Sequence, residues 1–167
     1  MAFKPTPPAP KTTVVDPGST WAVLMTAPTP VRVFFYGTFM LTEVLVEHGV
    51  TAGPVIPARL DGFELSIRPR VNLIRNPEAS AFGSVATVSH DDLDLLYDDL
   101  AKRFQLKYRP KAVVVTDDTG TQLSALCYIA PAMSEGSADP GYLAQLAAGV
   151  RSLGHPEWYA SHIESFL

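Results

Sequence analysis

The residues of this chain best suited to hold a small molecule lie where a strand-forming run ends at a glycine. Residues 31–37 read VRVFFYG, and TFM follows before a helical pattern begins at Leu41. A glycine at such a junction lets the backbone approach a ligand, and N–H groups at the start of the following helix can bind a carboxylate. The alternative is a tight turn in which Gly37 needs a positive φ angle. The residue types support the two interpretations about equally.

A second group of polar side chains lies in residues 68–80, which read RPRVNLIRNPEAS. Arg70, Asn72 and Arg75 alternate there with apolar residues, so Arg70 or Asn72 could point into a cavity and hold a carboxylate. Arginine matches the geometry of a carboxylate with two parallel hydrogen bonds. The alternative is a solvated edge strand, which we favour for Arg75.

Several common catalytic centres have no signature in the sequence. It contains neither a nucleophile-elbow serine nor a glycine-rich phosphate loop. His155 and His162 have no cysteine or third histidine nearby, so we expect no metal site. The single cysteine, Cys127, lies in a strand pattern and is interpreted as a small core residue rather than a nucleophile.

The elements that must position these residues are strands in the middle of the chain and helices at its end. After a helix near residues 41–49, the pattern predicts strands in residues 58–69 and 83–89. Residues 111–131 read as two strands joined by a turn at Asp118-Thr119-Gly120. Two helices follow, in residues 141–154 and after Pro156. This order predicts an α+β domain built on a curled mixed sheet.

A further helix is predicted to begin after Ser89. Ser89 as N-cap and Asp92 at the third helical position form a capping-box pattern. At about 100° per residue, one face of this helix, expected to be buried, holds Leu93, Leu96, Tyr97 and Leu100. Asp98 and Asp99 fall outside that face, so we expect the acidic run DDLDLLYDD to be a solvated surface.

Composition limits the class of protein. Residues 1–30 hold seven of the fifteen prolines and are interpreted as an extended arm, and residues 31–167 as one domain. The chain is 47% hydrophobic and 18% charged with a net charge of −4, and no basic stripe suits nucleic acid. Since no apolar run approaches the roughly 20 residues of a membrane span and no secretory signal is visible, we expect a cytoplasmic protein without membrane or nucleic-acid partners.

The stretch YGTFMLTE resembles the Tyr-Gly-Ser/Thr loop of the γ-glutamylcyclotransferase-like proteins, which include the AIG2-like proteins. The similarity continues in AFGSVATVSHDDLDLLYDDLAKRFQLKYRPKAVVV, where Gly83, Leu96 and Tyr108 occupy positions of the family pattern. It extends over residues 31–129. The resemblance implies a small mixed β-barrel with flanking helices.

The resemblance also implies a ligand pocket and a reaction. Enzymes of this family cyclise a γ-glutamyl compound to 5-oxoproline without a cofactor. The residues expected to bind such a small molecule are Tyr36, Gly37, Thr38, Phe39, Met40, Asn72, Leu100 and Tyr108.

The chain departs from the family at the catalytic residue. The alignment places Leu100 at the position of the glutamate that serves as general base, and leucine cannot accept a proton. Glu78 and Tyr97 are the candidates for a new catalytic role. Three functions stay open: a γ-glutamylcyclotransferase-like enzyme, a non-catalytic module that binds a small ligand, and an enzyme of the same fold with another substrate. The oligomeric state is not predicted.

Overall fold

Five strands form a single sheet that closes on itself in the order β1-β3-β2-β4-β5. The computed structural model describes residues 29–167, with β1 at Pro30–Phe35, β2 at Ile56–Ile67, β3 at Val71–Ser89, β4 at Arg109–Asp117 and β5 at Gln122–Ile129. Neighbouring strands are antiparallel except β1 and β5, whose short parallel pairing completes the barrel. The predicted α+β class with a small mixed barrel is confirmed.

The first strand begins at Pro30, inside the segment of residues 1–30 that the sequence assigns to an extended arm. Residues 1–28 of that arm, with the apolar stretch Trp21–Met25, lie outside the described part of the chain. The arm and its separation from a domain of residues 31–167 therefore stay a prediction.

The strand β3 is much longer than the sequence pattern indicates. The pattern predicts a strand at residues 83–89 and offers residues 68–80 only as a possible edge strand, yet β3 runs without a break from Val71 to Ser89. Its pairing with β2 shifts register between Asp61 and Phe63, and residues 76–79 have no paired residue in β2. Because Pro77 lies in this irregular stretch, its missing N–H removes no ladder hydrogen bond there.

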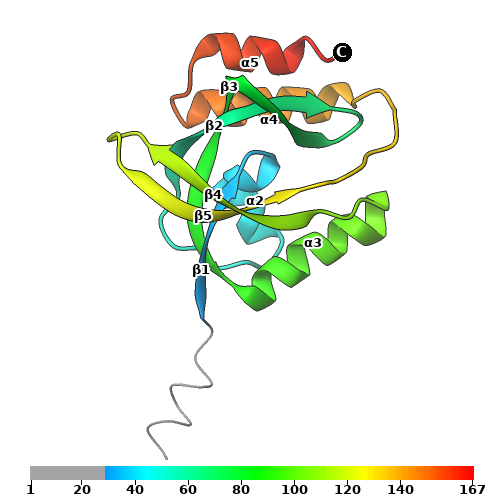
Figure 1. Cartoon of the computed structure of the whole chain (residues 1–167). Helices are drawn as coiled ribbons and strands as arrows, with labels where there is room; N and C mark the ends of the chain where they lie inside the picture. The colour runs from blue at the N-terminus through cyan, green and yellow to red at the C-terminus, as the bar shows by residue number, and fades with distance from the viewer. Residues whose placement is uncertain (1–28) are drawn as a thin grey trace, which may run out of the picture.

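Helices cover the sheet on different sides. A single 3₁₀ turn η1 (Thr38–Met40) and the short helix α2 (Thr42–Glu47) follow β1, and α3 spans His90–Phe104. Near the end of the chain, α4 (Pro140–Ser152) and α5 (Glu157–Glu164) lie together, away from α3 (Figure 1). None of the helices in residues 29–167 is both long and apolar enough to cross a membrane.

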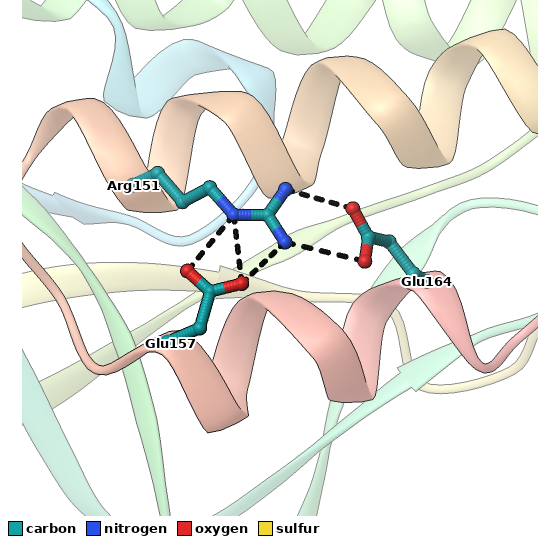
Figure 2. Close-up of polar contacts among 3 residues, drawn as sticks. All are labelled: Arg151, Glu157 and Glu164. Atoms are coloured by element: carbon teal, nitrogen blue, oxygen red, sulfur yellow. Dashed lines mark hydrogen bonds and ion pairs between the residues drawn. The ribbon is translucent and has the colours of Figure 1, made fainter.

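The last two helices are joined by one arginine as well as by their apolar faces. Leu143, Leu146 and Ile163 are almost completely buried in the core. On the surface, the guanidinium of Arg151 contacts Glu157 at 2.6 Å and Glu164 at 2.7 Å (Figure 2). Since Glu157 and Glu164 both lie on α5, Arg151 connects α4 to both ends of the final helix.

The predicted capping box at the start of α3 is present. Ser89 Oγ accepts a hydrogen bond from the Asp92 N–H at 3.1 Å, and Asp92 Oδ2 accepts from the Ser89 N–H at 3.4 Å. We expect Ser89→Ala to lower the free energy of unfolding by about 1 kcal/mol, because the helix loses its N-cap acceptor. Thermal unfolding measures this as a fall of about 2–4 °C in Tm. Ser89→Thr, which keeps the hydroxyl, serves as control; equal Tm values for the alanine and threonine variants would contradict the role of the cap.

Candidate functional site

The glycine two residues after β1 is closely packed and does not have a positive φ angle. Gly37 has φ −103° and ψ −159°, an extended conformation that any residue adopts, so the alternative of a tight turn with a positive φ angle at Gly37 is wrong. A Cβ at this position would lie 2.8 Å from Val71 Cγ1. The glycine therefore lets β3 approach the junction, while the Met40 N–H donates to the Gly37 carbonyl at 3.0 Å and starts the 3₁₀ turn.

A cavity of about 280 Å³ lies beside this junction. Its walls come from the end of β1 and η1, from α2 and α3, from the start of β3 and from residues near β4, β5 and α4. The lining residues are Phe35, Tyr36, Gly37, Thr38, Phe39, Val44, Glu47, His48, Arg70, Val71, Tyr97, Asp99, Leu100, Arg103, Phe104, Tyr108, Tyr128, Tyr142 and Gln145.

Most of the expected site residues, namely six assigned to ligand binding and Tyr97 assigned to a catalytic role, meet at this cavity. They are Tyr36, Gly37, Thr38, Phe39, Tyr97, Leu100 and Tyr108. The position of Leu100 is informative, because it is where the family resemblance expects the catalytic carboxylate. An aliphatic side chain there adds a hydrophobic wall and offers no proton acceptor.

Three expected site residues lie elsewhere. Met40 is completely buried in the core, with its carbonyl accepting from Ser84 Oγ at 2.9 Å. Asn72 uses its whole amide to bond the backbone of Ala130, at 2.9 Å and 3.0 Å, and so joins β3 to the segment after β5. Glu78 is exposed on β3 and does not line the cavity. This placement provides no support for a role of the three side chains at the cavity.

Aromatic rings form one continuous wall of the cavity. The rings of Tyr97 and Tyr128 stack with 3.8 Å between their centroids and 8° between their planes. Phe39 meets Tyr97 edge-on at 6.1 Å, and Tyr36 donates its hydroxyl hydrogen bond to the Tyr128 carbonyl at 2.6 Å. These contacts join Tyr36, which follows β1, to η1, α3 and β5, so four parts of the chain hold the wall together.

The buried tyrosines are poor proton acceptors. Desolvation raises the pKa of Tyr36, Tyr97 and Tyr108 above the ordinary value for tyrosine. Their hydroxyl groups therefore stay protonated near neutral pH and can donate hydrogen bonds. The proposed catalytic role of Tyr97 is thus restricted to donation. Burial likewise raises the pKa of the Cys127 thiol to about 12, as suits the core residue that the sequence predicts.

Charged groups of both signs line the cavity. The guanidinium of Arg70 lies between the rings of Phe104 and Tyr142, with its carbon 3.8 Å and 4.4 Å from their centroids. The carboxylate of Asp99 accepts from Arg103 Nε at 3.0 Å. Asp98 is exposed as predicted, but the expectation for Asp99 is wrong, since its side chain is only 31% exposed and lines the cavity. Asp99 and Arg103 lie one helical turn apart on α3, and both line the cavity.

His48 contributes an imidazole ring to the cavity wall. Its Nδ1 lies 2.8 Å from the Val44 carbonyl oxygen. A carbonyl only accepts, so Nδ1 carries the hydrogen, and in the neutral ring Nε2 holds the lone pair. The Phe39 ring packs edge-on against this imidazole at 5.2 Å.

The sequence left several wall residues unassigned. Arg103 and Phe104 follow Leu100 by three and four positions on α3, so extending the helical face would have found them. Tyr128 and Tyr142 carry no local signal of this kind, because β5 and α4 bring them to the cavity only in the folded chain. In residues 29–167, no group of three or more His, Cys, Asp or Glu side chains could hold a metal ion.

No protein-family model and no curated protein sequence matches the chain. Solved structures do match it. One is "Gamma-glutamyl cyclotransferase", with a TM-score of 0.67 and 19% identity over 82% of this chain and 88% of that one. The chain has the γ-glutamylcyclotransferase fold.

Two further structures with this fold are similar over most of their length. A yeast γ-glutamyl cyclotransferase specific to glutathione matches with a TM-score of 0.55 and 15% identity, over 83% of this chain and 95% of that one. A mouse AIG2-like protein matches with a TM-score of 0.50 and 17% identity, over 68% and 82%. At these identities the γ-glutamylcyclotransferase fold is shared, and the activities named belong to those proteins.

Proposed function

We propose that this chain binds a small γ-glutamyl compound in the cavity beside Gly37 and turns it over slowly or not at all. The observation that carries the proposal is the position of Leu100 in the wall of that cavity. The cavity, its aromatic wall and the Tyr36–Phe39 junction suit a small ligand, while an aliphatic residue occupies the place of the expected base. Loss of a general base typically removes about 10²–10⁴-fold of rate.

The proposed binding is tested by thermal unfolding with γ-glutamyl amines, γ-glutamyl amino acids and 5-oxoproline. A ligand that binds only the folded chain at 100 times its Kd stabilises it by about 2.7 kcal/mol, so Tm rises by roughly 5–10 °C. In parallel, chromatography should detect little 5-oxoproline when γ-glutamyl dipeptides are incubated with the protein. If none of these compounds changes Tm, the proposed ligand class is wrong.

A second candidate function is catalysis with a different proton acceptor. The observation that favours it is the hydrogen bond from His48 Nδ1 to the Val44 carbonyl, which leaves Nε2 with the lone pair at the cavity wall. In this reaction the substrate amine attacks its own γ-carbonyl carbon, and His48 takes a proton from that nitrogen. The proton then passes to the leaving amine nitrogen as the amide C–N bond breaks. Measurable 5-oxoproline production that is lost in His48→Gln, with ligand binding retained, would support this function over binding alone.

A further inference from the structure

The guanidinium of Arg70 lies over two aromatic rings at the cavity wall. Phe104 on α3 and Tyr142 on α4 lie against it at 3.8 Å and 4.4 Å. Ring stacking occupies the faces of a planar guanidinium, whereas its N–H donors point outward in the plane. A group that approaches the edge of Arg70 can therefore still accept two parallel hydrogen bonds.

The backbone that carries Arg70 is fixed by two of the cavity tyrosines. The Val71 N–H donates to the hydroxyl oxygen of Tyr142 at 3.2 Å, and the Val71 carbonyl accepts from the Tyr108 hydroxyl at 2.7 Å. The Arg70 carbonyl itself accepts from the Arg68 N–H at 3.2 Å. A side chain held in this way loses little further freedom when it binds a ligand.

No acidic side chain in residues 29–167 forms an ion pair with Arg70. In residues 29–167, ion pairs with an N–O distance within 4.0 Å involve Arg59, Arg103 and Arg151, and Arg70 forms none of them. Arg103, on the same cavity, pairs with Asp99. A half-buried cation without a counter-charge favours an anion in the space beside it.

We propose that Arg70 binds the carboxylate of the cavity's ligand, and that this contact sets the ligand's orientation. The identification of this carboxylate as the α-carboxylate of a γ-glutamyl compound rests on the proposed function. The γ-amide end then extends from Arg70 along the cavity toward the wall of Tyr97 and Leu100. The residue recognises a planar anion, so an uncharged analogue of the same shape binds poorly.

The test compares two ligands that differ only in this carboxylate. Isothermal titration measures the binding of γ-glutamylmethylamide and of 4-aminobutanoylmethylamide, which has hydrogen in place of the α-carboxylate. For the wild-type chain we expect the first to bind roughly 10- to 100-fold more tightly, the range for a hydrogen bond to a charged group. In Arg70→Gln this preference should disappear. Arg75→Gln is the matched control, since Arg75 lies on β3 close to Arg70 in the chain and also over an aromatic ring, Phe63, but outside the cavity.

The outcomes separate this inference from the proposed function. If γ-glutamylmethylamide binds equally to the wild-type chain and to folded Arg70→Gln, the role of Arg70 is wrong and the proposed function stands. If the γ-glutamyl compound does not bind but glutarate does, and only with Arg70 present, the proposed function is wrong and the carboxylate site stands. If neither binds the wild-type chain, both are wrong. If Arg70→Gln does not fold, the affinities of the two ligands are compared on the wild-type chain and on Arg70→Lys. Lysine keeps the positive charge but lacks the planar guanidinium that forms two parallel hydrogen bonds.

Discussion

Replacing Leu100 by glutamate is expected to raise the rate of 5-oxoproline release from a γ-glutamyl dipeptide by about 10²–10⁴-fold over the wild-type chain. The new carboxylate would lie in the cavity wall, where the resemblance to the γ-glutamylcyclotransferase-like proteins places the general base. A half-buried carboxyl group beside aromatic rings has a raised pKa, which moves it toward the working range of a general base near neutral pH. It would take the proton from the attacking α-amine and pass it to the leaving amine.

The matched control for this prediction is Leu100→Gln. Glutamine has nearly the same shape as glutamate and removes the same apolar contacts, but it cannot accept a proton as a base. Chromatographic detection of 5-oxoproline with both folded variants isolates the contribution of the carboxylate. Equal rates for the two variants would show that position 100 does not face the reacting amine, whatever the ligand.

Replacing Gly83 by alanine is expected to destabilise the chain by roughly 3 kcal/mol or more. A Cβ on Gly83 would lie 2.0 Å from the Phe35 carbonyl oxygen and 3.0 Å from Tyr36 Cα. Both contacts are with backbone, so either β1 or β3 has to move. Because Tyr36 and Gly37 follow at once, the movement should also distort the cavity. Thermal unfolding should show Tm lower by about 6–12 °C, with a parallel loss of ligand-induced stabilisation.

Gly53→Ala provides the control for a glycine without such a contact. Its Cβ would be 3.7 Å from the nearest atom of Thr87, an ordinary contact, and its φ is not in the positive range. Alanine there should change the free energy of unfolding by no more than about 1 kcal/mol. If Gly83→Ala were as stable as Gly53→Ala, the close approach of β1 and β3 would be an incorrect description of the barrel.

Much of the fold could be read from local patterns. The capping box at Ser89 marks the start of α3, and Gly49 with φ 75° ends the turn after α2. The turn at residues 118–120 joins β4 and β5 as expected. These features depend on residues close together in the chain, whose preferences act before tertiary contacts form.

The candidate site was predictable only in part. Tyr36, Gly37, Tyr97 and Leu100 were found because each lies in a recognisable element or matches a family motif. Asp99 was assigned to solvent because helical periodicity assumes one buried face, whereas a cavity at the flank of α3 buries a second set of positions. Met40 was expected at the ligand, but the 3₁₀ turn directs it into the core.

By itself, the sequence determined the order of strands and helices, the junction at Gly37 and the absence of a carboxylate at position 100, since these depend only on local residue types. Only the tertiary structure shows why Gly83 has to be glycine, because the backbone of Phe35 and Tyr36 approaches it closely, and that the Val71 side chain packs against Gly37. The tertiary structure also determines which arginine at the cavity wall is paired with an acid and which is not. Arg70 and Arg103 look alike in the sequence, and only the fold sets Arg103 against Asp99 and stacks Arg70 between two rings contributed by separate helices.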